Sequence, residues 1–338
     1  MTQDDQKKRN RILLVLFLGV LMGALDIAIV GPALTPIEKS FGVDVRTGAW
    51  VFTIYVLFNL IGTPLMAKLS DQHGRRIIYI TDVTLFAAGS LIVALSQNFT
   101  LFIIGRAIQG FGAGGIFPVA SAVIGDTFPP EKRGGALGLI GAVFGLAFVI
   151  GPILGGIILS IATWHWLFII NIPLAAVVIF LGARLLPTTK PETTAAFDWL
   201  GMLVVAVMLA SLAYGVNQID TAHFSSSLIS VDVWPYLLVS IISLIIFIPL
   251  EKRASDPIVR LDLFKRRQMT LAYVLSAGAG LGESGLVFIP ALAYAALNTK
   301  GVTESSASFL LMPVVLAMGF GSPLVGKLLD KLGSKVII

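Results

Sequence analysis

Long apolar stretches separated by short polar loops run through the whole sequence. A helix needs about 20 mostly apolar residues to cross a hydrocarbon layer roughly 30 Å thick. Backbone groups in lipid must bond within their own segment, so apolar runs of this length are expected to be helices. We therefore predict an all-α polytopic membrane protein. Ten stretches meet the requirement, at residues 12–34, 49–69, 77–96, 100–125, 134–160, 164–186, 199–218, 234–251, 269–297 and 305–329.

Composition supports lipid as the main solvent of the surface. Of the 338 residues 56% are hydrophobic and 13% are charged, and the mean hydropathy is +0.91. A soluble chain carries about 25% charged residues. The sequence has no cysteine and three scattered histidines, which excludes thiol chemistry and makes a metal cluster unexpected. We predict no cofactor, no metal site and no enzymatic activity.

The positions of the basic residues predict the orientation. With the N-terminus and the loops after even-numbered spans on one side, 20 of the 24 Lys and Arg residues fall there, three fall opposite and Arg106 lies within a span. Such a bias marks the cytoplasmic side. The N-terminus is thus predicted to be cytoplasmic, in a multi-pass protein of the cell membrane. The net charge of +5 is explained by the bilayer, without a nucleic-acid partner; the oligomeric state stays open.

Two related decapeptides, at residues 67–76 and 326–335, indicate an internal repeat. They share Lys, Leu, Asp, Gly and a final base in register, 259 residues apart. Repeated halves are a property of many secondary transporters. The acid can pair with bases or cap a neighbouring helix, and the glycine permits a tight turn. The candidate conformational residues in the two copies are Asp71, Gly74, Arg75, Arg76, Asp330 and Gly333.

At these decapeptides the sequence resembles the major facilitator superfamily, whose motif A reads G-x-L-x-D-x-x-G-R-[RK]. The first copy departs from it at Ala67 and at Gln72. In twelve-helix members the second copy follows helix 8, whereas here it follows the tenth predicted span. Two helices inserted between the halves are typical of the fourteen-helix drug:proton antiporter family, which the chain resembles.

Other stretches are similar to motifs of the same family. Residues 25–30 resemble L-D-x-T-I-V with Ala28 in place of Thr, residues 106–110 match motif B, and residues 164–173 resemble W-R-W-[IL]-F-x-I-N-x-P with His165 in place of Arg. Motif C, which marks antiporters within the superfamily, is matched in the fifth span. Its residues here are Gly141, Gly145, Gly151, Pro152, Gly155 and Gly156.

The resemblance implies three parts of the chain. Residues 1–186 would form the N-terminal six-helix bundle, 187–268 the two inserted helices with their cytoplasmic loops, and 269–338 the start of the C-terminal bundle. The family has four more helices after the second motif A, so we expect this sequence to be a fragment of a longer transporter.

Charged residues within the spans are the candidates for proton coupling. Burying an ionised carboxylate costs several kcal/mol, so Asp26 and Glu283 are each expected to face a cavity, find a partner or stay protonated. Each could instead form a fixed structural hydrogen bond. The resemblance implies that Arg106 influences protonation of the acid on the first helix; alternatively it binds backbone carbonyls.

Further polar residues are weaker candidates. Tyr55, Asn59 and Gln109 are possible substrate-cavity residues, whereas Asp82 is expected to reach or pair near the cytoplasmic face. Residues 110–115 satisfy G-x-G-x-x-G, but they lie inside an apolar helix rather than after a strand. Close helix packing is therefore the preferred explanation of these glycines.

Two classes of function remain open at this point. One is a proton-coupled antiporter that exports small, lipophilic or cationic compounds, with protons and substrate as its partners in the bilayer. The other is a protein of the same fold that moves another cargo, such as a lipid, an amino acid or a siderophore, or that senses rather than transports. An inactive truncated fragment is a third, simpler alternative.

The predicted topology can be tested with single cysteines, because the chain contains none of its own. Thiols introduced at Lys132 and Arg260 should react with an impermeant reagent only from the cytoplasm. Thiols at Thr100 and Thr299 should react only from outside. Labelling of position 260 from outside would contradict the inserted pair of helices.

Overall fold

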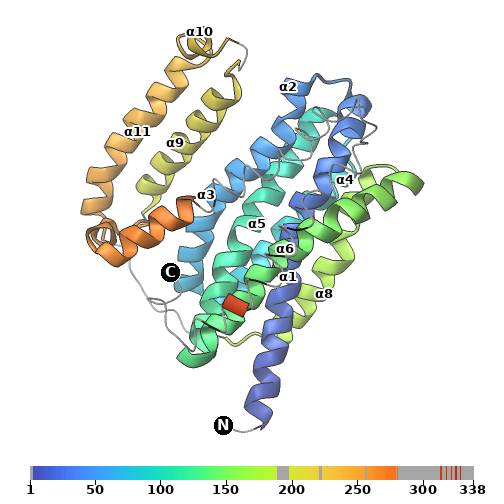
Figure 1. Ribbon diagram of the computed structural model, residues 1–338, viewed down its shortest axis with the longest axis vertical. Helices are drawn as coiled ribbons and strands as arrows, with labels where there is room; N and C mark the ends of the chain where they lie inside the picture. The colour runs from blue at the N-terminus through green and yellow to red at the C-terminus, as the bar shows by residue number, and fades with distance from the viewer. Residues whose placement is uncertain are drawn as a thin grey trace.

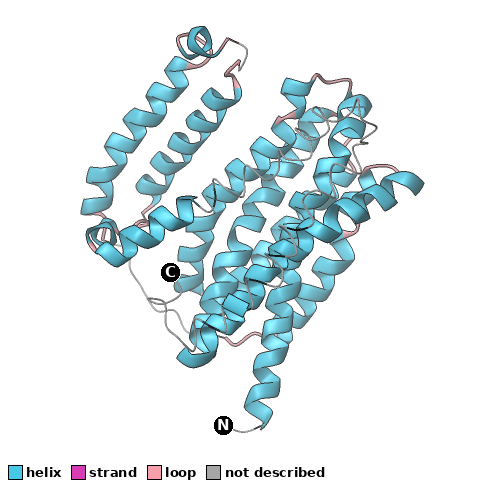
Figure 2. Cartoon of the chain, in the orientation of Figure 1, coloured by secondary structure: helices cyan, strands magenta, loops and turns pink. Residues whose placement is uncertain are grey.

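The computed structural model describes residues 3–188, 198–220, 223–255, 257–278 and 280, with six isolated positions between 313 and 328. The described part is helical throughout and contains no strand (Figure 2). Most of the ninth and tenth predicted spans lies outside the described residues. So do the candidates Glu283, Asp330 and Gly333.

Eight described helical segments are long and apolar enough to cross a membrane. They correspond to the first eight spans predicted from the sequence, and the all-α prediction is confirmed. Short helices complete the chain, and residues 267–278 are also helical. The elements are α1 (Gln3–Phe41), α2 (Val45–Gly48), α3 (Trp50–His73), α4 (Arg75–Ala94), α5 (Phe99–Thr127), α6 (Pro130–Ile161), α7 (His165–Ile169), α8 (Asn171–Leu185), α9 (Trp199–Asn217), α10 (Phe224–Leu228), α11 (Trp234–Arg253) and η1 (Leu261–Lys265).

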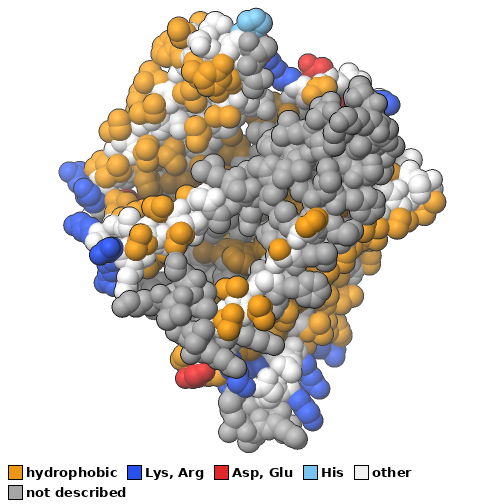
Figure 3. Space-filling view, viewed as in Figure 1, with side chains coloured by type: hydrophobic (Ala, Val, Ile, Leu, Met, Phe, Trp, Pro, Cys, Tyr) orange, Lys and Arg blue, Asp and Glu red, His pale blue; other side chains and the backbone are white. Residues whose placement is uncertain are grey.

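Helices α1 and α3–α8 form one bundle, and α9 and α11 form an antiparallel pair beside it (Figure 1). Within the bundle α5 packs on both α3 and α4, while α1 packs on α6 and α8. The α9–α11 pair contacts the bundle through α3. Hydrophobic side chains cover the outer face of this pair, and Lys and Arg side chains gather near the lower ends of the helices (Figure 3).

The core of the bundle consists of two apolar clusters with polar side chains between them. The larger cluster includes buried residues 12–24 of α1, 78–86 of α4 and 116–124 of α5. The smaller cluster includes Phe102 of α5 and residues 29–37 of α1. Between these apolar segments lies a layer of buried polar side chains from α1, α4, α5 and α8. The polar residues in this layer are Asp26, Ser90, Arg106, Gln109 and Asn171.

Glycines on α5 allow its neighbours to approach closely. A Cβ atom at Gly110 would overlap the backbone carbonyl of Tyr55 on α3, and one at Gly112 would overlap the carbonyl of Asp82 on α4. Gly114 has the same relation to Asn59. Small residues at helix interfaces permit such packing in membranes. The geometry supports the packing explanation of the G-x-G-x-x-G sequence.

Asp82 corrects one expectation from the sequence. Its side chain does not reach the cytoplasmic face: the residue is 0% exposed. Neither carboxylate oxygen has a hydrogen-bond partner within the described ranges. A Cβ at Gly115 of α5 would overlap this carboxylate, so the side chain is enclosed between α4 and α5. Counting residues from Arg76 placed Asp82 correctly along α4 but could not show which face of the helix is covered.

Candidate functional site

A buried ion pair between α1 and α5 is the centre of the polar layer. Arg106 Nη1 donates to Asp26 Oδ2 at 2.6 Å, and both side chains are 0% exposed. The two residues are 80 positions apart in the sequence. Because an isolated charge is costly in an apolar interior, the pair explains how either residue is tolerated there.

Two amides complete the hydrogen bonding of the carboxylate. Gln109 Nε2 donates to Asp26 Oδ1 at 2.7 Å, and Asn171 Nδ2 donates to the same oxygen at 3.0 Å. Both amide nitrogens also donate to Ser90 Oγ, at 2.8 and 3.3 Å. The carboxylate of α1 thus accepts hydrogen bonds from two other helices, from Arg106 and Gln109 on α5 and from Asn171 on α8. Such charge-assisted bonds are stronger than bonds between neutral groups.

The position of Gln109 depends on its spacing from Arg106 and on one glycine. Three residues apart, the two side chains share a face of α5, and Arg106 Nη1 donates to Gln109 Oε1 at 2.7 Å. A Cβ at Gly89 of α4 would overlap the backbone of Gln109. The close approach at Gly89 brings its neighbour Ser90 to the amide.

Arg106 also has backbone and aromatic contacts. Its Nε donates to the carbonyl of Val51 on α3 at 3.2 Å. The guanidinium carbon lies 4.2 Å from the ring centroid of Tyr55 and 5.7 Å from that of Phe168. Aromatic faces stabilise a desolvated cation. Arg106 Nη2 and the Tyr55 hydroxyl have no hydrogen-bond partner in the part of the chain that the structure describes.

Motif C lies on α6, the helix that packs on α1. A Cβ at Gly151 would overlap Ala28, two residues beyond Asp26, and one at Gly155 would lie 3.3 Å from the Ile29 carbonyl. Gly141 and Gly156 have open space around them, Gly145 is buried, and Pro152 lies inside the helix. Only part of the motif therefore faces the segment of α1 that carries the acid.

The first copy of motif A forms a second polar cluster at the other end of α4. Gly74 has φ +96°, a conformation that favours glycine, and it separates α3 from α4. Arg75 forms an ion pair with Asp71, and its Nε donates to Asp126 Oδ2 of α5 at 3.1 Å. Nη1 donates to Ser70 Oγ at 2.7 Å. The cluster joins the ends of three helices.

Arg76, the last base of that motif, contacts a different helix. Its Nη1 donates to the carbonyl of Ala183 on α8 at 3.3 Å. The two adjacent arginines thus connect the start of α4 to α5 and to α8 respectively.

The structure brings together three of the residues proposed from the sequence and adds others. Asp26, Arg106 and Gln109 are in direct contact, and the Tyr55 ring lies against the guanidinium. Asn59 is half-buried, and its backbone carbonyl accepts a hydrogen bond from the Thr63 hydroxyl at 2.8 Å. Within the described residues no group of three His, Cys, Asp or Glu side chains could hold a metal ion.

Three contributors were missed: Ser90, Asn171 and Asp126. Asn171 is the Asn of the quoted stretch 164–173, so a signal for it existed. Ser90 and Asp126 were invisible because a single small polar residue, or an acid at the end of a span, becomes meaningful only when helix faces are known.

Comparison with known proteins identifies the family. The family model described as Major Facilitator Superfamily matches residues 16–338. The chain belongs to the major facilitator superfamily. It is a multi-pass membrane protein of that superfamily.

Relatives of known sequence include several bacterial transporters. The chain is 36% identical over 334 residues to the uncharacterized MFS-type transporter YfiU of Bacillus subtilis, with 97% of this chain and 64% of the relative covered. It is 33% identical over 326 residues to multidrug resistance protein 3 of the same organism, covering 96% and 62%. It therefore spans less than two thirds of the length of these relatives.

A solved structure supports the same fold. The human organic anion transporter MFSD10 (TETRAN) is similar with a TM-score of 0.64 and 18% sequence identity, over 94% of this chain and 72% of that protein. At this identity the likeness concerns the fold alone.

The buried pair should show strong energetic coupling in a double-mutant cycle. Arg106→Met leaves Asp26 buried without its counter-ion and should destabilise the protein by about 3–5 kcal/mol. Adding Asp26→Leu should recover much of that loss, because no charge then remains unpaired. The measurement is thermal unfolding of the purified protein in detergent. Simple additivity of the two single changes would contradict a direct pair.

Proposed function

We propose that this superfamily member is a proton-coupled antiporter that exports small, lipophilic or cationic compounds across the cell membrane, with its N-terminus in the cytoplasm. The observation that carries the proposal is the Asp26–Arg106 pair enclosed by Gln109 and Asn171. Intramembrane carboxylates in transporters mark ion and proton pathways. The similarity to multidrug resistance protein 3 of Bacillus subtilis supports the class of cargo.

The geometry explains how proton binding would be linked to conformation. Every described partner of the Asp26 carboxylate is a hydrogen-bond donor. A proton on Asp26 would remove the counter-charge of Arg106, whose guanidinium is a permanent cation. A buried cation without a counter-ion is costly, so protonation of Asp26 would weaken the present packing of α1 against α5 and favour another arrangement of these helices.

The available driving force is sufficient for export against a gradient. One proton moving inward gains about 2.3 kcal/mol per 100 mV, roughly a fortyfold concentration ratio, with any pH difference added. Transport uses this energy only if proton and cargo occupancy are coupled. The Asp26–Arg106 pair joins α1 to α5, so proton and cargo would be coupled through the packing of these two helices. A second acid, Glu283, remains a candidate outside the described residues.

The motif A cluster is proposed to stabilise one conformation of the transport cycle. Arg75 holds Asp71 and Asp126 together at the ends of α3 and α5. Contacts of this kind bias a conformational equilibrium only if they differ between its states. The second copy at Asp330 and Gly333 would have the corresponding role in the other half.

The first functional prediction concerns this cluster. Asp71→Asn and Asp126→Asn each remove one charged partner of Arg75, and both should slow turnover while equilibrium binding of substrate stays detectable. Initial transport rates and substrate binding are to be measured on the same purified preparations. Glu131→Gln is the control. It also removes one acid, in the first turn of α6, but Glu131 forms no ion pair in the described structure. Loss of binding in a folded Asp71→Asn protein would point to a direct substrate role instead.

The second prediction tests proton coupling in the full-length transporter. Asp26→Asn should abolish export driven by a pH gradient and proton release on substrate binding, because the amide cannot be ionised. Substrate exchange across equilibrated vesicles should persist, since an amide resembles a protonated acid. Asp82→Asn is the matched control: it removes a buried carboxyl that contacts none of the central residues.

Two outcomes would decide against the assignment. Gradient-driven export that survives in a folded Asp26→Asn protein would move the role to another acid, Glu283 first. If wild-type everted vesicles, offered cationic and neutral dyes under an imposed pH gradient, accumulate none of them, the cargo class is wrong even though the fold stands.

A further inference from the structure

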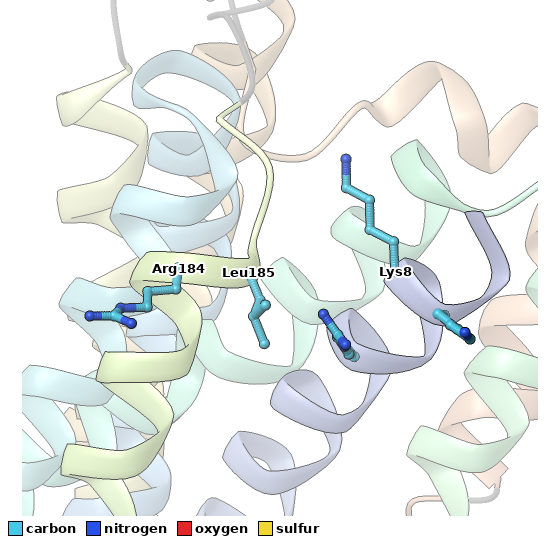
Figure 4. Close-up of a pocket in the computed structure, with 5 residues that line it drawn as sticks. Lys8, Arg184 and Leu185 are labelled. Atoms are coloured by element: carbon cyan, nitrogen blue, oxygen red, sulfur yellow. The ribbon is translucent and has the colours of Figure 1, made fainter. Parts of the chain in front are cut away.

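A pocket lined by four basic side chains lies between the start of α1 and the end of α8. Its volume is about 330 Å³, and its lining consists of Lys7, Lys8 and Arg11 from α1 with Arg184 and Leu185 from α8. Figure 4 shows Lys8 on α1 across from Arg184 and Leu185 at the end of α8. This volume is at the lower end of the roughly 300–1,000 Å³ of small-molecule sites. It suits a headgroup rather than a whole lipid.

The charges of this pocket are not balanced by its lining. No acid lines it, and none of the four bases takes part in an ion pair within the described ranges. Arg184 has an aromatic contact instead, with its guanidinium carbon 4.4 Å from the ring centroid of Phe180. Four like charges around one cavity repel one another, and a bound anion would relieve that repulsion.

The surface next to the pocket is apolar and uncovered. Leu14, one turn from Arg11 on α1, is 53% exposed. Phe180 and Val177, one and two turns from Arg184 on α8, are 53% and 47% exposed. A free phosphate ion gains nothing from these side chains. A molecule with an anionic head and hydrocarbon chains satisfies both parts of the surface at once.

We propose that this pocket binds the headgroup of an anionic phospholipid, whose acyl chains lie against the exposed apolar residues of α1 and α8. Basic pockets between transmembrane helices at the cytoplasmic side bind such headgroups. The site borders the motif A contacts, because Ala183, which accepts the hydrogen bond from Arg76, precedes Arg184 in the chain. A bound lipid would therefore lie beside the connection between α4 and α8.

The test measures lipid retention by the full-length protein in detergent. Native mass spectrometry counts bound phosphatidylglycerol and, separately, phosphatidylcholine. The pocket variant is Lys7→Gln/Lys8→Gln/Arg11→Gln, and a second variant, Arg184→Gln, leaves the N-terminal bases intact for membrane insertion. The matched control is Lys265→Gln/Arg266→Gln/Arg267→Gln, which removes the same charge from three exposed bases outside the pocket.

We expect tight retention of phosphatidylglycerol by wild type and control, about a hundredfold weaker apparent affinity in the triple pocket variant and about fivefold weaker affinity in Arg184→Gln. Phosphatidylcholine should not be retained. An equal loss in the control would show diffuse attraction and overturn the site. Displacement of phosphatidylglycerol by millimolar inorganic phosphate would show a free-anion site and overturn the lipid assignment. If the triple variant does not fold, Arg184→Gln decides alone.

Discussion

The ion pair between Asp26 and Arg106 places a constraint on the whole bundle. Two charges at full burial are tolerated only when their remaining hydrogen-bonding groups are also satisfied. Gln109 and Asn171 therefore point at one carboxylate oxygen, and Ser90 accepts from both amides. These polar groups come from α5, α8 and α4, and they meet only because the backbones of these helices lie close together.

Close approach is the contribution of the glycines. Gly89, Gly110 and Gly112 each stand where a Cβ atom would overlap the backbone of a neighbouring helix. A Cβ at Gly151 would overlap the side chain of Ala28 on α1, two residues beyond the central acid. Apolar side chains alone would not select this geometry in lipid, since lipid tails are as apolar as leucine. Small residues and the polar layer together define which faces of the helices meet.

The sequence predicted the part of this architecture that depends on one helix at a time. The spans followed from local hydropathy, and Asp26 and Arg106 stood out because charges are rare at that depth. Their contact follows only from the packing of α1 on α5. Asp82 was wrongly expected near the cytoplasmic face for the same reason. Its position along α4 follows from the sequence, but the close approach of α5 at Gly115, which buries the Asp82 side chain, does not. Asp126 and Ser90 carry no local signal that separates them from ordinary helix residues.

The sequence separation of the ion pair has a consequence for biogenesis. Asp26 of α1 is synthesised before Arg106, which follows 80 residues later on α5, the fourth of the described spans. An aspartate at the centre of an inserting helix costs about 2.5–3.5 kcal/mol, and its counter-ion does not yet exist at that moment. The span that carries Asp26 must therefore enter the membrane on the strength of its own apolar residues, and it contains the most apolar stretch among the described spans. Asp26 therefore has no counter-ion in the membrane until α5 is inserted. Formation of the Asp26–Arg106 pair is also the step at which α1 gains its charged contact with α5.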